Sequence, residues 1–327
     1  MNKNLFNLQK LSWLSGSRCV VTGGAGFIGS HVTEQLSKLG LKVTVIDDLS
    51  TGREINLKGI ACTVVKGTIT DEALLTKEFE GADYVFHIAA IPAVPRSIEN
   101  PTATAFANIW GTQTVLECAR KAKVKKVVYS ASSSAYGGIT SREARAEDLA
   151  PQPLSPYAAQ KLTGEYLCKV YAHSMGLNTV SLRYFNIFGP RQNPESTYAA
   201  VIPKFIKLNL AKQPIPINGD GLQSRDFTYI ENAVLANLLA SNPEAKTSGE
   251  VMNVACGSTF TLLELVKQID TITGNKSKLE FLPTRAGDVN YSLANISKAK
   301  KLIGYEPQVS FTEGLQKLIE EMQAAGI

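Results

Sequence analysis

The sequence predicts a protein of the α/β class, with a doubly wound parallel sheet and a smaller α/β lobe that binds the substrate. A short apolar run at 18–22 leads directly into a glycine-rich turn at 23–29, where an amphipathic helical pattern begins. Patterns typical of strands and helices then alternate as far as residue 183. Because parallel strands need crossover connections between them, strict alternation favours a parallel sheet covered by helices on both faces.

The expected strands and helices follow one another in the order that a doubly wound sheet requires. The runs at 85–88 and 127–130 are almost entirely apolar, as is typical of central strands that are buried on both faces. We expect strands at 18–22, 42–46, 63–66, 84–88, 126–131 and 178–183, and helices at 27–39, 71–79, 101–122 and 157–175.

The rhythm loosens after residue 183, and prolines and glycines between 188 and 226 surround one helical pattern at 198–212. An apolar helical pattern and a short strand pattern within 230–256 are expected to return to the sheet, and further helices are expected at 261–273, 297–303 and 312–325. The predicted organisation is an extension at 1–16, a dinucleotide-binding domain at 17–185 with about 228–256, and a substrate lobe at 186–227 and 257–327.

Composition and charge narrow the class of protein. The 327 residues are 44% hydrophobic and 19% charged, and no apolar run approaches the ~20 residues that span a bilayer. The first residues lack the pattern of a signal peptide, so we expect a cytoplasmic protein with no membrane contact. Five well-separated cysteines predict reduced thiols, and three scattered histidines disfavour a metal site. The net charge of +5 lacks a basic run, which favours an anionic small substrate over nucleic acid, although a solvated surface explains it equally well.

The glycine-rich turn predicts a binding site for a dinucleotide. Gly23, Gly26 and Gly29 lie between a strand and a helix, which is where such glycines let the main chain approach a pyrophosphate. The following strand pattern ends on Asp47 and Asp48, about 20 residues further on. A carboxylate at this place binds the adenosine ribose and repels a 2′-phosphate, so NAD is favoured over NADP. The alternative is that Asp47 is a plain turn residue.

Tyr157 and Lys161 are predicted to lie on one face of a helix, because they are four residues apart. Lowering the pKa of a phenol from about 10 to roughly 7 requires about 4 kcal/mol. One cation about 6 Å away supplies about 3 kcal/mol at an effective dielectric constant of about 20. A second cation, such as an oxidised nicotinamide, would supply the rest and offset desolvation. The alternative is a chance pair on a surface helix.

With these motifs and the strand end at 130–137, the chain resembles the extended short-chain dehydrogenase/reductase family from about residue 17 to near its C-terminus. Within that family it is most similar to the UDP-hexose 4-epimerases, especially those that act on N-acetylated sugars. The resemblance implies a Rossmann domain, tightly bound NAD and a UDP-sugar substrate. It also implies a homodimer formed through the helices that begin near Pro101 and Pro156.

The resemblance also implies the reaction. Tyr157 removes the proton of the 4-hydroxyl while C4 gives hydride to NAD+, and the keto-sugar turns and receives the hydride on its other face. Lys161 lowers the pKa of Tyr157 and holds the nicotinamide ribose, and Ser132 passes or holds the proton. Dehydratases of the family carry acidic residues where this chain has Ser133 and Ser134, so a dehydratase is disfavoured.

Further residues match family positions that contact the cofactor or the substrate. An aspartate that usually contacts adenine is replaced here by Thr68, which still offers a hydroxyl. The implied cofactor contacts are Gly23, Gly26, Phe27, Ile28, Gly29, Asp47, Asp48, Ser50, Thr51, Gly52, Thr68, Ile69, Ala89, Ala90, Asn108, Tyr157, Lys161, Tyr184 and Phe185. The implied substrate contacts are Ser133, Ser134, Asn186, Arg191, Ala200, Val201, Asn218, Arg225, Arg285, Asp288 and Ser292.

Ser292 is expected to set the size of the sugar pocket. Epimerases restricted to glucose and galactose carry a tyrosine at the matching place, so serine leaves room for an N-acetyl group at C2. This favours UDP-GlcNAc and UDP-GalNAc, together with UDP-Glc and UDP-Gal, although Ser292 can also be read as a small loop residue. Two alternatives stay open: a UDP-glucuronate 4-epimerase or decarboxylase, and a non-catalytic NAD(H)-binding sensor.

Overall fold

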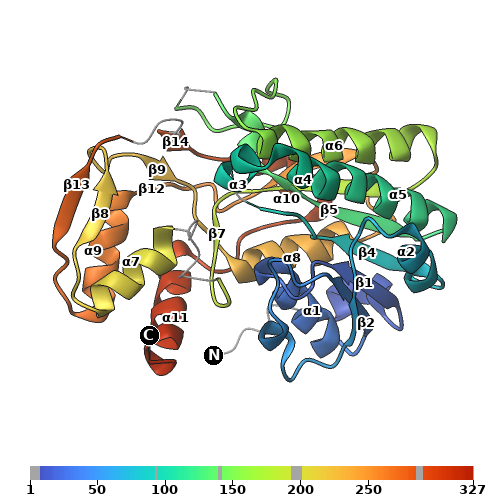
Figure 1. Ribbon diagram of the computed structural model, residues 1–327, viewed down its shortest axis with the longest axis horizontal. Helices are drawn as coiled ribbons and strands as arrows, with labels where there is room; N and C mark the ends of the chain where they lie inside the picture. Colours follow the sequence, from blue (N-terminus) through green and yellow to red (C-terminus); the bar gives the residue numbers. More distant parts are fainter. Residues whose placement is uncertain (1–7, 93, 139–141, 193–200, 285–289, 327) are drawn as a thin grey trace.

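A seven-stranded parallel sheet forms the centre of the computed structural model, which describes residues 8–92, 94–138, 142–192, 201–284 and 290–326 (Figure 1). The order places the first strand beside the fourth, so the sheet has a switch point between them, where doubly wound proteins bind ligands. The predicted doubly wound fold is confirmed. In spatial order the strands are β11 (Glu250–Val254), β6 (Thr179–Tyr184), β5 (Lys126–Ser132), β4 (Tyr84–His87), β1 (Arg18–Thr22), β2 (Lys42–Asp47) and β3 (Thr63–Lys66).

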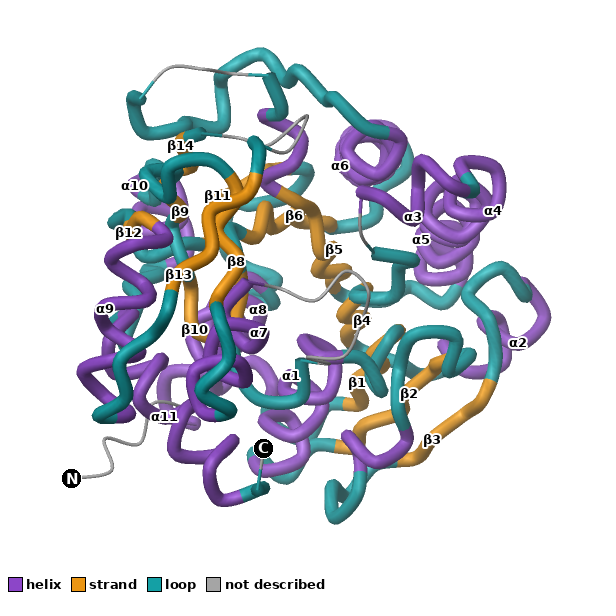
Figure 2. The backbone as a smooth tube through the Cα atoms, turned by 60° about the vertical axis from the view of Figure 1, so that its left-hand side comes forward, coloured by secondary structure: helices purple, strands orange, loops and turns teal. Residues whose placement is uncertain are grey.

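Helices cover both faces of this sheet, as Figure 2 shows. The helices α1 (Phe27–Lys38) and α8 (Ile230–Ala240) pack on one face, against alternate strand residues such as Val21 and Phe86. The other face packs, through residues such as Val20 and Val85, against α2 (Glu72–Phe79), α5 (Gly111–Lys121) and α6 (Pro156–Ser174). Among the described residues, no helix is both long enough and apolar enough to cross a bilayer.

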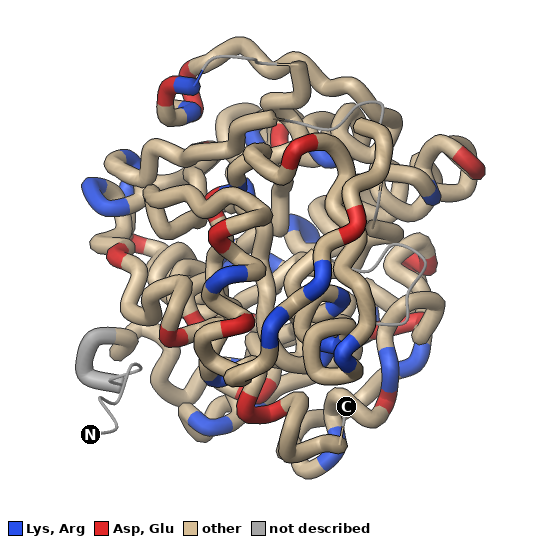
Figure 3. The backbone as a smooth tube through the Cα atoms, turned by 90° about the vertical axis from the view of Figure 1, so that its left-hand side faces the viewer, with Lys and Arg blue, Asp and Glu red and all other residues tan. Residues whose placement is uncertain are grey.

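The second lobe lies beside the sheet, on the left of Figure 1. Figure 3 shows its acidic and basic residues mixed over this side of the molecule. The predicted helix at 198–212 is described only from residue 201 onwards. The elements from residue 187 onwards, apart from α8 and β11, are β7 (Ile187–Phe188), α7 (Val201–Leu210), β8 (Ile215–Asn218), β9 (Ser224–Arg225), β10 (Thr228–Tyr229), β12 (Phe260–Thr261), α9 (Leu262–Thr273), β13 (Leu279–Leu282), β14 (Tyr291–Ser292), α10 (Ser297–Ile303) and α11 (Phe311–Ala324).

Two features near the switch point differ from the expected elements. The single helix expected at 101–122 consists of α4 (Pro101–Ala105), a π-helical turn at Phe106–Trp110, and α5. A short helix, α3 (Val94–Glu99), was not predicted and lies against the start of α6, where the main-chain N–H of Tyr157 donates to Ser97 Oγ at 3.0 Å. Only the π-helical turn contributes a residue, Ala107, to the cavity described below, and π-helical turns often occur at functional sites.

The predicted N-terminal extension packs against the sheet domain. Residues Leu8–Leu14 form a 3-10 helix, in which Leu11 and Leu14 are fully buried in the core. The Trp13 ring N–H donates to Ser241 Oγ at 3.0 Å, and the Tyr84 hydroxyl donates to the Trp13 carbonyl at 3.1 Å. The signal in the sequence is weak because two apolar residues three apart are too few to define a helical period.

We predict that Leu14→Ala lowers the free energy of unfolding by about 3 kcal/mol, because truncation of a fully buried leucine leaves a cavity. Urea denaturation followed by circular dichroism measures the change. Ser15→Ala, at an exposed neighbouring position, is the matched control and should change stability little. Equal stability of wild type and Leu14→Ala would contradict the packing of this segment.

Candidate active site

The glycine turn between β1 and α1 has geometry that a side chain would block. Gly23 has a φ of +71°, and a Cβ at this position would lie 2.6 Å from the Ala89 Cα. A Cβ on Gly29 would lie 2.0 Å from the Gly23 carbonyl oxygen. No side chain caps the start of α1, where Gly26 is the N-cap residue. The N–H groups of the first turn therefore face the cavity without a side-chain acceptor, as a pyrophosphate site requires.

A cavity of about 320 Å³ opens at the carboxyl ends of the strands around this turn. Most of the predicted cofactor contacts line it. Gly52 does not, and it packs against the Asp47 carboxylate instead: a Cβ built on Gly52 would lie 2.8 Å from Asp47 Oδ1. The predicted residues that line the cavity are Gly23, Gly26, Phe27, Ile28, Gly29, Asp47, Asp48, Ser50, Thr51, Thr68, Ile69, Ala89, Ala90, Tyr157, Lys161 and Tyr184.

Asp47 ends β2 beside the glycine turn. Its carboxylate accepts the main-chain N–H of Ala25 at 2.9 Å and that of Leu49 at 2.8 Å. Burial raises the pKa of Asp47, and these two hydrogen bonds act in the opposite direction. Each oxygen retains a further lone pair, so Asp47 ties the turn to β2 and can still accept from a ribose hydroxyl.

The cavity also contains residues that were not predicted or were given another role. Arg53 and Asn56, in the loop after β2, and the pair Ile91 and Pro92 line it without having been predicted. Arg191 was expected to contact the substrate diphosphate, but it lines this cavity beside the glycine turn and pairs with Glu34 of α1. Its Nη1 is buried with no hydrogen-bond partner among the described residues, so this guanidinium is available to a phosphate of the dinucleotide.

Asn108, in the π-helical turn, was expected on the ribose side of the cofactor. It is fully buried, and its side chain accepts from the Ile91 N–H at 2.8 Å and donates to the Ile91 carbonyl at 3.1 Å. A third hydrogen bond, of 2.8 Å, joins it to Gln160 of α6. Asn108 does not line the cavity but fixes the main chain of Ile91, which does, and its contact on the ribose side stays a prediction.

The start of α6 places Tyr157 and Lys161 in the cavity. Ser155 caps the helix by accepting the Ala158 N–H at 3.2 Å, and a proline occupies the first turn. The Lys161 ammonium donates to the Ser130 carbonyl at 2.9 Å and lies 5.0 Å from the centre of the Tyr129 ring. Gly164 permits this close packing, because a Cβ there would lie 2.2 Å from the Tyr129 hydroxyl oxygen.

The protein's own groups do not bring the pKa of Tyr157 near 7. Burial raises the pKa of Tyr157 to about 12, and a hydrogen bond with Ser132 acts in the opposite direction. Burial also lowers the pKa of Lys161 to about 8. The expectation that one ammonium is nearly sufficient is therefore wrong, because desolvation of the phenolate outweighs it. A second cation, such as an oxidised nicotinamide, is therefore essential for Tyr157 to act as a base near pH 7.

Ser132 lies at the end of β5 beside Tyr157, as predicted. Its hydroxyl oxygen accepts the Ser134 N–H at 3.2 Å and the Ser134 hydroxyl at 2.8 Å. Because both lone pairs of Ser132 are used in this way, its own proton is directed away from the turn. Ser134, which was expected to face the sugar, thus orients Ser132.

Tyr184 and Phe185 are consecutive residues at the end of β6, but one side chain lines the cavity and the other is buried in the protein interior. Tyr184 lines the cavity, and its hydroxyl is fixed by Ser130 Oγ at 3.1 Å and by the Asn237 side-chain N–H at 2.8 Å. Phe185 is fully buried, 5.9 Å from the Tyr136 ring, and does not line the cavity. The side chains of Tyr184 and Phe185 point to opposite faces, as successive residues of a strand do, and the cofactor contact of Phe185 stays a prediction.

Several predicted substrate residues meet around β9 and β14. Ser292 pairs in register with Arg225, and the Asn186 side chain donates to the Asp226 carbonyl at 3.2 Å. The Asp226 main chain donates to the Ser292 carbonyl at 2.7 Å. Asn218 and Val201 lie in β8 and at the start of α7. The remaining predicted residues Ala200, Arg285 and Asp288 lie outside the described residues.

Comparisons with known proteins agree with this geometry. The profile of the NAD dependent epimerase/dehydratase family matches residues 19–255. A UDP-glucose 4-epimerase from Mycolicibacterium smegmatis is 35% identical, over 93% of this chain and 97% of its own length. A UDP-glucuronate 4-epimerase from Thermodesulfobacterium geofontis is 36% identical, over 92% of this chain and 94% of its own length.

A solved structure is similar over nearly the whole chain. It is the UDP-N-acetylglucosamine 4-epimerase from Methanobrevibacter ruminantium M1 in complex with UDP-N-acetylmuramic acid, which has 38% sequence identity and a TM-score of 0.90. The likeness covers 95% of this chain and 99% of that one. The predicted resemblance, the epimerase class of enzyme and the NAD cofactor are confirmed. This chain therefore belongs to the NAD-dependent epimerase/dehydratase family.

Proposed function

We propose that the protein interconverts UDP-GlcNAc and UDP-GalNAc, and also UDP-Glc and UDP-Gal, by transient oxidation at C4 with tightly bound NAD. The observation that carries this proposal is that Tyr157 and Lys161 line the cavity beside the glycine turn, with Ser132 hydrogen-bonded to Tyr157. Gly23, Gly29 and the buried, unpartnered Arg191 Nη1 provide space and charge for a dinucleotide pyrophosphate.

Each residue has a distinct task in the proposed reaction. Bound NAD+ would supply the hydride acceptor for C4 and a second positive charge in the site. Tyr157 takes the proton of the 4-hydroxyl and returns it after the sugar has turned. Ser132, whose proton is directed to the Tyr157 oxygen, holds the C4 oxygen between these steps. Lys161 is anchored on Ser130 and holds the nicotinamide ribose.

The choice of sugar is proposed to depend on Ser292, which is a small residue beside Arg225 in the second lobe. A serine leaves space for a C2 N-acetyl group. The relative that acts on UDP-N-acetylglucosamine supports this substrate. The 36% identical UDP-glucuronate 4-epimerase supports the second candidate, epimerisation of a UDP-uronate, which the same assay detects.

We propose a homodimer that forms through α4, the π-helical turn and α6. Phe106, Trp110, Tyr166 and Val170 are between 51% and 57% exposed on these elements, and we call them the apolar face. Glu72 and Gln113 line a hollow that also includes Trp110. A second copy of this surface would remove the four apolar side chains from water.

Tyr157→Phe removes the base while keeping the ring, so turnover of every UDP-sugar should fall by about 10³-fold. Product formation from UDP-GlcNAc and UDP-Glc, followed by NMR, measures the loss. Tyr166→Phe, at an exposed position of the same helix, is the matched control and should retain activity. Near-wild-type turnover by Tyr157→Phe would contradict the proposed base.

Ser292→Tyr should fill the space for the N-acetyl group. We expect turnover of UDP-GlcNAc to fall at least about tenfold relative to that of UDP-Glc, since overfilling a packed site costs about 1–3 kcal/mol. The ratio of kcat/KM for the two sugars is the measurement, and Ser292→Ala is the small-residue control. Equal loss on both sugars would count against the size gate.

Trp110→Glu should place a charge at the centre of the apolar face and convert the dimer to a monomer. Light scattering coupled to size-exclusion chromatography measures the molar mass. Ile55→Glu introduces the same charge at a similarly exposed isoleucine, 57% exposed, outside this face and should leave the dimer intact. A wild-type monomer, or a Trp110→Glu dimer, would refute this interface.

A further inference from the structure

A buried ion pair lies beneath the catalytic end of α6. Arg183 of β6 donates from Nε to Glu165 Oε1 at 2.9 Å and from Nη2 to Glu165 Oε2 at 2.7 Å. The two side chains are only 4% and 2% exposed. Desolvation of two charges offsets most of their attraction, so stability alone is a weak reason for a buried pair. Its position suggests a different role.

Glu165 follows Lys161 by one helical turn, so both side chains lie on the buried face of α6. Lys161 is only 4% exposed, and burial lowers the pKa of its ammonium to about 8, while Cys168 and Glu165 act in the opposite direction. Burial raises the pKa of the Cys168 thiol to about 12, so this group is neutral near pH 7. Burial raises the pKa of Glu165, while the hydrogen bonds and charge of Arg183 act in the opposite direction, so the ion pair with Arg183 favours the carboxylate. Glu165 is therefore the anion that favours the charged form of Lys161.

The other groups that face Lys161 supply no negative charge near pH 7. Tyr157 lies one turn before it on α6, and Tyr129 of β5 lies beneath it, and burial raises the pKa of each phenol. His87 of β4 is fully buried, and burial, assisted by the Lys161 charge, lowers its pKa to about 3. Among the described groups that act on the pKa of Lys161, Glu165 is therefore the one that carries a negative charge near pH 7.

Arg183 also packs against the short helical turn that follows Ser132. The Arg183 guanidinium lies 4.6 Å from the centre of the Tyr136 ring, and Tyr136 ends the short helical turn Ser133–Tyr136. The Tyr136 hydroxyl donates to Asn253 Oδ1 of β11 at 2.9 Å. Buried contacts therefore link the ion pair to the serine turn and the sheet edge, and the Glu165 charge links the pair to Lys161.

We propose that Glu165, clamped by Arg183, is a positioning residue that keeps Lys161 charged and in place for the reaction. The inference rests on the proposed function, because it assigns a support to the Tyr157 and Lys161 pair. Neither Glu165 nor Arg183 lines the cavity, so they act through Lys161 and touch neither cofactor nor sugar.

The test is the pH profile of kcat for UDP-Glc, measured on holoenzyme between pH 6 and 10. At high pH, kcat should fall as the Lys161 ammonium loses its proton, and we call this fall the alkaline limb. In Glu165→Gln the ammonium loses its nearby anion, so the pKa of Lys161 falls and the alkaline limb should move to lower pH by about one unit. The rate at pH 8 should then fall several-fold, whereas KM for the UDP-sugar should stay within twofold. A limb that stays at the wild-type pH, in a folded variant, overturns the proposal.

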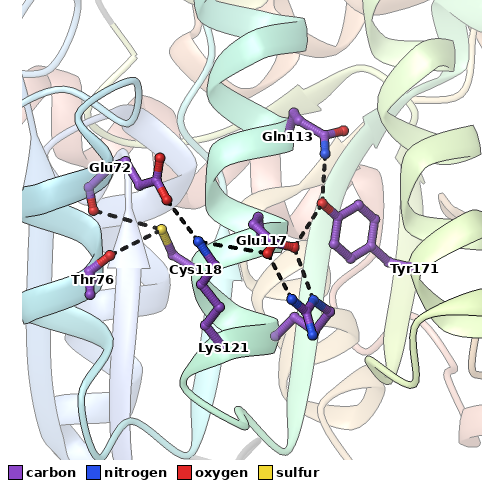
Figure 4. Close-up of polar contacts among 8 residues, drawn as sticks. Glu72, Thr76, Gln113, Glu117, Cys118, Lys121 and Tyr171 are labelled. Carbon is purple, nitrogen blue, oxygen red and sulfur yellow. Dashed lines mark hydrogen bonds and ion pairs between the residues drawn. The ribbon is translucent and has the colours of Figure 1, made fainter.

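Two further variants keep the test decisive. Glu165→Gln leaves a buried arginine without a partner and can fail to fold, so Glu165→Leu combined with Arg183→Met removes both charges. Its limb should also move to lower pH, because the Glu165 charge raises the pKa of Lys161, whereas Arg183 is not among the groups that shift it. Glu117→Gln is the matched control. Glu117, on α5, also binds an arginine through both oxygens and accepts from Tyr171 (Figure 4). It is not among the groups that shift the pKa of Lys161.

The outcomes separate this inference from the proposed function. Wild-type turnover with an unmoved limb in both Glu165 variants overturns the inference and leaves the epimerase proposal intact. A limb that moves equally in Glu117→Gln also overturns it, because the effect would then not be specific to the buried pair. Absence of wild-type turnover overturns the proposed function, and this inference with it.

Discussion

The burial of the Lys161 ammonium between α6 and β5 is the constraint on which much of the site depends. The ammonium donates to the Ser130 carbonyl, which fixes the helix against the end of the strand that also carries Ser132. Gly164 allows the helix to approach Tyr129 closely enough for this contact. Because desolvation opposes the charge, the site needs both an anion behind the lysine and a second cation in front of the tyrosine. The packing of α6 on β5 thus determines which charges the reaction needs.

Much of the fold could be predicted because long periodic segments carry their own signal. The six strands before residue 185 and the helix at 27–39 were expected within one or two residues of the observed bounds. The π-helical turn at Phe106–Trp110 was missed because its pattern continues that of the flanking helix. Two-residue strands such as β9 and β14 have no period at all, and only the folded chain brings them together.

The site was predictable where its residues lie in one local motif and less so where contacts are made through space. Tyr157 and Lys161 follow from helical spacing, and the glycine turn follows from its place between strand and helix. Arg191 lies far along the chain from Glu34, so its place in the dinucleotide cavity has no local signal. The balance of pKa effects at Tyr157 was also misjudged, because the cost of burial depends on packing that spacing does not reveal.

The most direct measurement is to incubate the purified protein with UDP-GlcNAc, without added cofactor, and to identify the products by NMR. The proposed arrangement of Tyr157, Lys161 and Ser132 around retained NAD predicts that UDP-GalNAc appears and that both sugars reach a fixed ratio. Parallel incubations with UDP-Glc and UDP-GlcA show whether the pocket is broader. Absence of any epimer from all of these sugars, even after NAD is added, would contradict the account.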